Sequence, residues 1–282
     1  MKNPMIFELE SAAGNGVFYD IKGFSNFNYR TESDKDIKTV LLDKFPVSFE
    51  DYSDAFEIVQ ENIHKGNSYL LNLTFPVRIE TEYQLLDIFR ISQAPYKLFF
   101  NDQFVLFSPE SFIKINNGLI SSFPMKGTID ASVPNAEKVI LADDKEYWEH
   151  NTIVDLIRND ISMVSKEVNV KRFRFIDRIV TPEKQLLQVS SEIEGKLDSR
   201  WRSTLGELIW KLLPAGSISG APKKKTVDII KESELDERGY YTGVFGIFDG
   251  ENLDSAVNIR FIEKTSNGMY FRSGGGITAL SN

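Results

Sequence analysis

A lysine and a glutamate on either side of a short strand-forming stretch are the first residues whose types could do chemistry. Lys126 stands between a proline and a glycine in the sequence FPMKGT, and Glu110 comes earlier, directly after Ser108-Pro109. A lysine held on a rigid turn could act as a nucleophile or a base if burial lowered its pKa. If Glu110 faces the same cavity, the two form a candidate pair for nucleophilic and acid–base catalysis. The alternatives are an exposed turn lysine and a solvated glutamate.

The segment GSISGAPK, at residues 216–223, places glycines and hydroxyl groups ahead of a predicted helix. Pro222 suits the first position of that helix, so free backbone amides and the positive end of the helix dipole would face an anion. The segment lacks the spacing of a Walker nucleotide-binding loop. We interpret it as an anion site, with a well-capped helix start as the alternative.

A second glycine-rich segment, SGGGITA at residues 273–279, resembles a nucleotide-binding fingerprint. Only three residues follow it, so no helix and second strand can complete a dinucleotide-binding unit, and we reject that function. Its three glycines still allow backbone amides to approach a ligand closely. The segment is therefore a second candidate anion site, with a flexible tail as the alternative.

Glu149 lies on the longest predicted helix, within the sequence WEHNTIVDLIRND. A charged residue on such a helix normally belongs to a solvated face. A lone carboxylate could also bind magnesium, provided that substrate oxygens and water complete its coordination.

Composition excludes several classes of function. The chain contains no cysteine and two histidines, which excludes thiolate nucleophiles, thiolate zinc sites and multi-histidine metal sites. Any ammonia used must come from outside, because many glutaminases release it with a cysteine. The net charge of −8 argues against nucleic-acid binding. No apolar stretch is long enough to span a membrane and no secretory signal is present, so we expect a cytoplasmic protein.

The elements that must position these residues are predicted from periodicity and capping. Ser48 with Asp51 forms a capping box ahead of an amphipathic helix that Gly66 ends. Further helices are predicted at residues 145–164, 201–213 and 223–233, and strands at 6–9, 16–19, 68–79, 96–100, 104–107 and 112–115. A C-terminal meander turns at Asp249-Gly250 and Asn267-Gly268. The pattern predicts a single α+β domain on antiparallel sheet, with a small N-terminal segment at residues 1–45 packed on a core of residues 46–282.

Taken in order, these segments resemble the chorismate-utilising enzymes, which include anthranilate synthase and aminodeoxychorismate synthase component I, with isochorismate and salicylate synthases as relatives. The resemblance runs from about residue 49 to the end of the chain. It rests on GNSYLLNLT (66–74), SPE (108–110), PMKGT (124–128), EHNTIVDLIRND (149–160), SEIEG (191–195), GSISGAPK (216–223), ERGYYTGVFG (237–246) and GGGIT (274–278). It implies a two-sheet α/β sandwich flanked by helices, with chorismate and magnesium in a central cleft.

The resemblance also implies an activity. Aminodeoxychorismate synthases typically carry PIKGT where anthranilate synthases have alanine in place of the lysine, so PMKGT favours the former. The implied reaction joins chorismate and ammonia into 4-amino-4-deoxychorismate, for p-aminobenzoate and folate, and a separate glutamine amidotransferase subunit supplies the ammonia. One alternative is a lyase or isomerase that makes anthranilate or isochorismate on the same fold. Another is a subunit that binds without turnover.

The resemblance assigns roles residue by residue. Lys126 attacks C2 of chorismate, Glu110 is the general acid and base, and magnesium on Glu149 holds the C1 carboxylate. The residues expected to bind the substrate are Thr128, Ser219, Tyr241, Arg260, Gly274, Gly275 and Gly276.

Two departures from the family pattern bear on these expectations. Relatives continue past GGGI with a helix that carries a second magnesium-binding glutamate, whereas this sequence ends at Asn282. We therefore expect either a truncated sequence or compromised metal binding. At Gln188, relatives often carry a histidine linked to pyruvate elimination, and its absence weakens an interpretation as a lyase.

Overall fold

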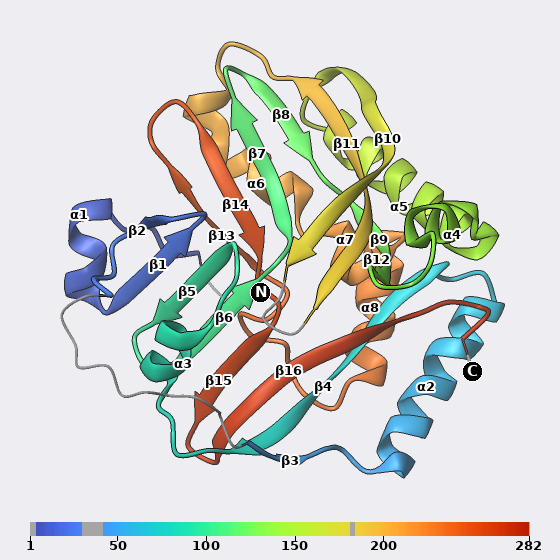
Figure 1. Cartoon of the computed structure of the whole chain (residues 1–282), viewed down its shortest axis with the longest axis horizontal. Coiled ribbons are helices and arrows are strands. Elements are labelled where there is room, and N and C mark those ends of the chain that lie inside the picture. The colour runs from blue at the N-terminus through green and yellow to red at the C-terminus, as the bar shows by residue number, and fades with distance from the viewer. Residues whose placement is uncertain (1–3, 30–41, 181–183, 282) are drawn as a thin grey trace. The chain divides into compact units, whose positions relative to one another are not determined.

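The computed structural model describes residues 4–29, 42–180 and 184–281. The chain forms two compact units that are interleaved in sequence. Unit 1 comprises Met1–Pro109, Ile218–Phe245 and Ala256–Asn282, and unit 2 comprises Glu110–Ser217 and Gly246–Ser255. Each unit is built on its own antiparallel sheet, with helices beside it (Figure 1). The predicted α+β class, with two sheets and flanking helices, is confirmed.

Nine strands of the described chain form the sheet of unit 1, in the order β12-β4-β16-β15-β6-β5-β1-β2, with β3 also beside β4. Its two longest strands, β4 and β16, are neighbours in one continuous register. The strands are β1 (Val17–Ile21), β2 (Phe24–Ser25), β3 (Asp43–Phe45), β4 (Leu70–Glu80), β5 (Tyr96–Phe100), β6 (Phe104–Ser108), β12 (Gly220–Ala221), β15 (Phe261–Thr265) and β16 (Gly268–Ile277).

Helices pack on the unit 1 sheet at two places. Helices α2 (Phe49–His64) and α8 (Lys223–Ser233) bury apolar side chains such as Val59 and Ile229 in one cluster with residues of β4 and the last residue of β16. Helix α3 (Leu85–Ile91) forms a second cluster with β4, β5, β6 and β15. The short helices α1 (Leu9–Ala12) and η1 (Ala13–Asn15) precede β1.

The sheet of unit 2 has seven strands among the described residues, in the order β10-β11-β8-β7-β14-β13, with β9 also beside β11. The strands are β7 (Ser111–Asn116), β8 (Leu119–Ser122), β9 (Met125–Asp130), β10 (Lys166–Val180), β11 (Gln185–Lys196), β13 (Val244–Phe248) and β14 (Leu253–Val257). Helices α4 (Ala136–Ala142) and α5 (Asp144–Ser162) pack on it, and α5 contributes buried residues such as Ile153 and Ile161. Helices η2 (Trp201–Thr204), α6 (Leu205–Leu212) and α7 (Gly216–Ser219) follow.

The helices predicted from capping and periodicity are confirmed. The Ser48 hydroxyl accepts a hydrogen bond from the Asp51 N–H at 3.1 Å and donates one to the Asp51 carboxylate at 2.7 Å, and α2 starts at the next residue. Gly66, which follows the end of the helix, has φ +75°. Positive φ is accessible to glycine without strain, which explains why the helix ends there.

One expectation differs from the structure. The strand predicted at residues 6–9 is wrong, because Leu9 begins α1 and residues 6–8 belong to no strand. The division into a small segment at residues 1–45 and a core of residues 46–282 stays a prediction. In the structure, β1 pairs with β5 and is an internal strand of the unit 1 sheet.

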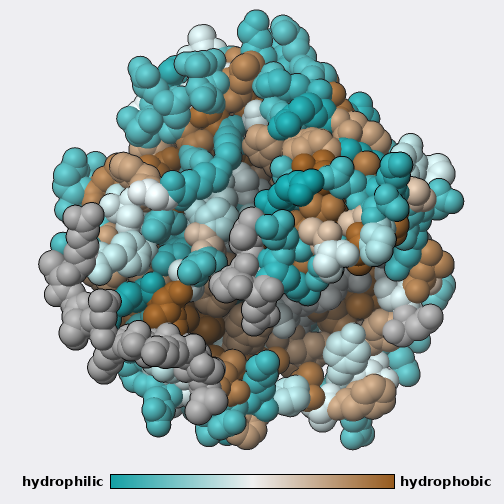
Figure 2. Space-filling model, viewed as in Figure 1, coloured by the Kyte–Doolittle hydropathy of each residue, from teal (hydrophilic) through white to brown (hydrophobic). Residues whose placement is uncertain are grey.

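Figure 2 shows hydrophilic residues interspersed with hydrophobic ones on the visible face. In the described part of the chain, no helix is both long enough and apolar enough to cross a membrane.

Candidate active site

The β7–β8 hairpin explains how Glu110 and Lys126 come near each other. Glu110 directly precedes β7, and Lys126 is the second residue of β9, which follows β8. The hairpin strands are antiparallel, with Asn116 opposite Leu119 beside the turn, so the chain enters and leaves the hairpin at the same end. The positive charge of Lys126 acts on the Glu110 carboxyl. The predicted pair therefore lies in one unit and within electrostatic reach.

Strand β9 contains a β-bulge at Lys126. Met125 is opposite Ser190 of β11 and Thr128 is opposite Gln188, so two residues of β9 face a single residue of β11. A bulge bends its strand and redirects side chains, and bulges are common beside active sites. The prediction that Lys126 lies on a turn is therefore wrong, because pairing with β11 makes this segment a strand.

Gly127, the second residue of the bulge, allows this backbone conformation. Its φ is +78°, in the left-handed region that other residues rarely adopt. A Cβ at this position would also lie 2.9 Å from Oε2 of Glu146 on α5. Lys126 itself is half-buried, so the alternative of a fully exposed turn lysine does not hold.

Glu110 is a half-buried residue, and burial of its carboxyl raises the pKa of that group. A hydrogen bond with the Ser217 hydroxyl and the charge of Lys126 both act in the opposite direction without cancelling the effect of burial. A raised pKa keeps a carboxylic acid protonated over a wider pH range, as a general acid requires. Sequence reasoning missed Ser217, although it lies in the GSISG segment that had been singled out.

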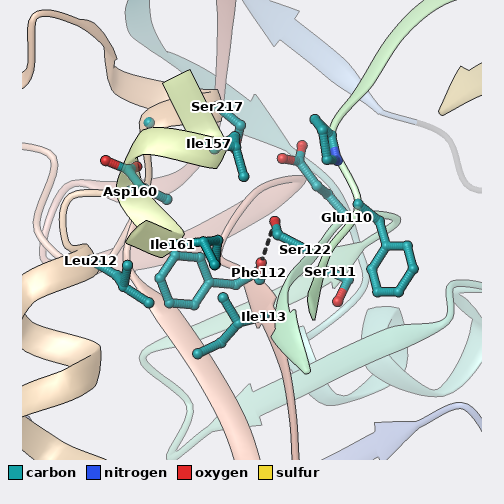
Figure 3. Close-up of a pocket in the computed structure, with 14 residues that line it drawn as sticks. Glu110, Ser111, Phe112, Ile113, Ser122, Ile157, Asp160, Ile161, Leu212 and Ser217 are labelled. Carbon is teal, nitrogen blue, oxygen red and sulfur yellow. Dashed lines mark hydrogen bonds between the residues drawn. The ribbon is translucent and has the colours of Figure 1, made fainter. Parts of the chain in front are cut away.

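A small cavity in unit 2 lies beside these groups (Figure 3). Its volume is about 20 Å³, and Glu110, Asp160 and Ser217 line it together with apolar residues of β7 and α5. A cavity of this size holds about one water molecule, whereas ligand pockets usually exceed about 300 Å³. The cavity therefore suits a solvent molecule beside the Glu110 carboxyl and is too small for a ring-sized substrate.

Glu149 lies on α5, one turn after Glu146, and its side chain is 25% exposed. Lys145 Nζ is 3.9 Å from its carboxylate. Among the described residues, no group of three or more acidic, histidine or cysteine side chains could hold a metal ion. Glu146 and Glu149 can still offer two carboxylates from one helix face. That donor set fits magnesium only where water and substrate oxygens supply the remaining ligands.

His150, the next residue of α5, is fully buried beside the strand that pairs with β9. Its Nε2 is 2.7 Å from the Ser191 hydroxyl, which also accepts a hydrogen bond from the Arg174 N–H at 3.0 Å. Burial, together with the smaller effects of the charges of Arg174 and Lys126, lowers the pKa of His150 to about 4. His150 is therefore neutral at neutral pH and acts as a structural link between α5 and β11.

Thr128 and Gln188 face each other across β9 and β11. The Gln188 amide donates to the Thr128 hydroxyl at 3.4 Å, and Thr128 is exposed. The Gln188 Oε1 atom is buried without a hydrogen-bond partner among the described residues. An amide that bonds Thr128 cannot replace the acid–base capacity of a histidine at this position.

In unit 1, Gly274, Gly275 and Gly276 belong to strand β16 and are exposed, so the alternative of a flexible tail does not hold. A Cβ at Gly274 would lie 2.1 Å from Oδ1 of Asn72 and 2.3 Å from Cγ2 of Thr74. Glycine at this position is thus required by close packing against β4.

The amides of two of these glycines are directed away from β4. In an antiparallel pair, opposite residues alternate between those that bond each other and those whose N–H and C=O groups point outward. The N–H of Thr74 and the C=O of Asn72 bond side chains that lie off β16, so Gly274 and Gly276, opposite them, also direct their groups away from β4. On the edge of β16 that faces away from β4, β15 pairs with β16 only as far as Arg272. No described strand pairs with this edge after Arg272. These N–H groups can therefore bind an anion.

The GSISG segment differs from its expected form. It forms the four-residue helix α7 and strand β12 before Pro222, which takes the N-cap position of α8 rather than its first helical position. Ser219 is buried. Gly220 has φ +119°, and a Cβ there would lie 1.9 Å from the Leu70 carbonyl oxygen. Close pairing with β4 thus explains this glycine.

Tyr241 and Arg260 are the remaining predicted binding residues. Tyr241 is buried, and burial raises the pKa of its hydroxyl to about 12, so it is a neutral hydrogen-bond donor. Arg260 is exposed, and its backbone adopts φ +52°, immediately before β15. Its charge acts on Tyr241.

The predicted residues therefore fall into two groups. Unit 2 carries the acid–base and nucleophile pair with Thr128 and Glu149, and unit 1 carries Ser219, Tyr241, Arg260 and the three glycines. Within unit 2 the arrangement offers an amine within electrostatic reach of a carboxyl whose pKa is raised. Within unit 1 it offers neutral donors, a guanidinium and outward amides, which suit carboxylates.

Comparison with known protein sequences gives a consistent result. The profile of a family described as chorismate binding enzyme matches residues 19–282. An uncharacterised PabA-like protein of Pasteurella multocida is 52% identical, over 99% of this chain and 86% of its own length. Aminodeoxychorismate synthase component 1 of Salmonella typhimurium is 34% identical over 82% of this chain, and anthranilate synthase component 1 of Acetivibrio thermocellus is 32% identical over 83%. The chain spans 53% and 49% of those two proteins.

Solved structures share the fold. Anthranilate synthase component I from Streptococcus pneumoniae superimposes with a TM-score of 0.73 at 24% identity, over 87% of this chain and 56% of that protein. The menaquinone-specific isochorismate synthase of Escherichia coli superimposes with a TM-score of 0.71 at 16% identity, over 86% of this chain and 59% of that protein.

Proposed function

Because this chain belongs to the chorismate-binding enzyme family, we propose that it is an aminodeoxychorismate synthase component I, which places ammonia on C4 of chorismate. The observation that carries the proposal is the lysine at the β9 bulge, within electrostatic reach of a carboxyl with a raised pKa. An amine and an acid in this arrangement suit a covalent substitution of an allylic hydroxyl group. The 34% identity to the Salmonella aminodeoxychorismate synthase component 1 supports the same reaction.

In the first step, Nζ of Lys126 attacks C2 of chorismate. The C2–N bond forms, the ring double bonds shift, and the C4–O bond breaks. Glu110 donates its proton to the departing hydroxyl, which leaves as water. The raised pKa of Glu110 favours this step because it keeps the carboxyl protonated up to a higher pH than an ordinary glutamate.

In the second step, ammonia attacks C4 and the double bonds shift back. The C2–N bond to Lys126 breaks and the lysine amine is regenerated. The Glu110 carboxylate accepts the proton that the new C4 amine loses. The covalent detour replaces one difficult displacement by two allylic ones.

The two carboxylates of chorismate account for the donors of unit 1. The Tyr241 hydroxyl, the Ser219 hydroxyl and the Arg260 guanidinium are assigned to carboxylate binding, with the outward amides of Gly274 and Gly276. A protein with a net charge of −8 needs such local donors to hold a dianion.

Magnesium is the proposed cofactor, and Glu149 with Glu146 would hold it. When bound, it supplies a positive charge for the C1 carboxylate and polarises the ring. Lys145, 3.9 Å from Glu149, balances the charge of this carboxylate in the protein itself.

The ammonia is proposed to come from a separate glutamine amidotransferase subunit. The chain has no cysteine, so it cannot itself release ammonia from glutamine through a thiolate. The cytoplasmic location stays a prediction.

An anthranilate synthase activity is the second candidate, favoured by the 32% identity to the Acetivibrio protein. It places nitrogen on C2 and eliminates pyruvate, and isochorismate formation is the related isomerase alternative. Incubation with chorismate, magnesium and ammonium chloride, followed by chromatography and mass analysis, distinguishes the three products.

The decisive test is Lys126→Ala, because the lysine is assigned to occupy C2. The variant should lose most C4 amination, and any remaining product should shift toward C2 substitution. Intact-protein mass spectrometry of the wild type, quenched with chorismate and without ammonia, should show an adduct on Lys126. Lys114→Ala is the matched control, since Lys114 is a half-buried lysine of the same unit, and it should keep the adduct. Wild-type C4 amination by Lys126→Ala would exclude the lysine mechanism.

A further inference from the structure

An ion pair between Glu234 and Arg238 lies at the end of α8 in unit 1. Arg238 donates through Nε to Oε2 of Glu234 at 2.9 Å and through Nη2 to Oε1 at 2.5 Å, so the pair is bidentate. The Arg238 side chain is 13% exposed and that of Glu234 is 5% exposed. Such a pair is both directional and shielded from water.

The same two side chains bond the backbone of β4. Arg238 Nη2 donates to the Asn72 carbonyl at 2.5 Å, and Glu234 Oε1 accepts from the Thr74 N–H at 3.0 Å and from its hydroxyl at 2.9 Å. On one edge of an antiparallel strand, the C=O of one residue and the N–H of the residue two positions later both point toward the neighbouring strand and would bond it. Strand β12 pairs only with Leu70 and Leu71, so the ion pair takes the place of a strand along the next part of this edge.

Arg238 also contacts two further segments that carry predicted binding residues. Its Nη1 donates to the carbonyl of Ile218 at 3.4 Å, and Ser219 is the next residue. Its own carbonyl accepts from the Tyr241 N–H at 2.9 Å. Arg238 therefore joins β4 and the GSISG segment through its guanidinium, and it joins the turn that presents Tyr241 through its backbone carbonyl.

The consequence for β16 follows from the register. Asn72 and Thr74 lie opposite Gly276 and Gly274. With their outward groups bonded by the ion pair, β4 is fixed in the position that directs the glycine amides to the other edge of β16. If the pair were lost, the open edge of β4 could twist or slip, and the glycine amides would move with it.

We propose that Glu234 and Arg238 are positioning residues that hold the amides of Gly274 and Gly276, and with them Ser219 and Tyr241, in place for a substrate carboxylate. The inference rests on the proposed function for its substrate, and on the register and hydrogen bonds of unit 1 for its geometry. Neither residue is assigned contact with the substrate.

The test separates two contributions of the Glu234–Arg238 pair: its directional hydrogen bonds and its opposite charges. Arg238→Lys keeps the charge and loses the fork, and Glu234→Gln keeps an acceptor and loses the charge. The exchanged variant, Glu234→Arg with Arg238→Glu, restores opposite charges but places the donor and acceptor the wrong way round. Arg90→Lys is the matched control, because Arg90 pairs with Asp87 in the same unit.

Chorismate affinity by calorimetry, steady-state kinetics and hydrogen exchange of β4 and β16 are measured for each variant. Arg238→Lys should raise KM and the chorismate Kd about tenfold while kcat changes less than about threefold. This pattern is expected when a mutation weakens substrate binding without touching the reacting groups. The exchanged variant should not recover the wild-type chorismate affinity or the wild-type rate of hydrogen exchange. Amides of β4 and β16, Gly275 included, should exchange about tenfold faster in Arg238→Lys than in Arg90→Lys.

Unchanged affinity and exchange in Arg238→Lys, or full recovery by the exchanged variant, would overturn the inference. If Arg238→Lys does not fold, the milder Glu234→Gln decides by the same two measurements. Failure of the proposed function has a different result: the wild type would form no 4-amino-4-deoxychorismate, whereas hydrogen exchange would still report on the positioning role.

Discussion

The Glu110 carboxyl is stabilised in its protonated form, so its ionisation at higher pH works against the folded state. Its pKa is raised in the folded protein, which therefore binds more protons than the unfolded chain as pH rises above the ordinary glutamate range. Across that range, up to the raised pKa, the free energy of unfolding of the wild type falls. Above the raised pKa, ionisation of Glu110 lowers the free energy of unfolding no further.

Glu110→Gln should therefore be less active and yet more stable at neutral pH. Removing the acid should lower turnover by about 10²–10⁴-fold. The melting temperature of the variant should exceed that of the wild type at pH 8, and the difference should shrink as pH falls to 4. Thermal melts from pH 4 to pH 8 measure this. A difference that is the same at every pH would show that burial does not raise this pKa.

Glu149 can supply only part of a magnesium site. Because the described chain offers no group of three ligands, magnesium binding should be weak without chorismate and tighter with it. Glu149→Gln should lower turnover more than it lowers the melting temperature. Calorimetry with and without chorismate is the measurement, and Glu137→Gln, on the neighbouring α4, is the control. Tight, chorismate-independent binding would mean that the ligands lie elsewhere.

At the scale of single elements, the glycines of β16 have distinct roles. A methyl group at Gly274 would meet Asn72 and Thr74 at 2.1 and 2.3 Å, whereas at Gly275 no described atom lies within 4 Å. Gly274→Ala should therefore destabilise the protein by about 1–3 kcal/mol, as overpacking does. Gly275→Ala should change stability little. Urea unfolding of both variants gives the comparison, and equal losses would exclude packing as the reason for glycine at 274.

Elements specified by nearby residues could be predicted from the sequence. Ser48 with Asp51 predicts the start of α2, and the aromatic-rich sequence YKLFF predicts β5 at its observed bounds. The β9 bulge could not be predicted, because it depends on pairing with β11, far along the chain. For the same reason Lys126 was identified as chemically important while its setting, a strand, was missed.

In the candidate site, too, features that depend on nearby residues could be predicted and contacts between distant segments could not. Lys126 and Glu110 were identified from residue type and family pattern, and a strand-forming stretch between them was recognised in the sequence. The contacts of Ser217 with Glu110 and of Arg238 with Asn72 join segments that are distant in sequence. No local pattern reports such contacts. Glu234 and Arg238 are four residues apart, which suggests a pair, but their bonds to β4 need the folded chain.

At the scale of the whole molecule, unit 2 is completed by a segment outside its main stretch. Strand β14 lies beside β7, and the buried Ser255 hydroxyl donates to the Ile113 carbonyl at 2.6 Å and accepts from its N–H at 3.1 Å. Residues 110–217 alone lack this strand and would expose an edge of the sheet.

A fragment of residues 110–217 should therefore fail to unfold cooperatively, as measured by circular dichroism during heating. The same fragment joined through a flexible linker to residues 244–257 should recover a cooperative transition, because β13 and β14 then restore the edge. Cooperative unfolding of the shorter fragment would show that β14 is dispensable.

The pairing of β4 with β16 also sets an order of events during synthesis on the ribosome. Leu71 pairs with Ile277, so the edge of β4 that faces β16 stays open until residue 277 has been translated. The last segment of unit 2 ends at Ser255 and emerges earlier. Unit 2, although it begins later in the sequence, can close first, and the nascent β4 is until then an unpaired strand edge of the kind that makes folding intermediates prone to aggregation.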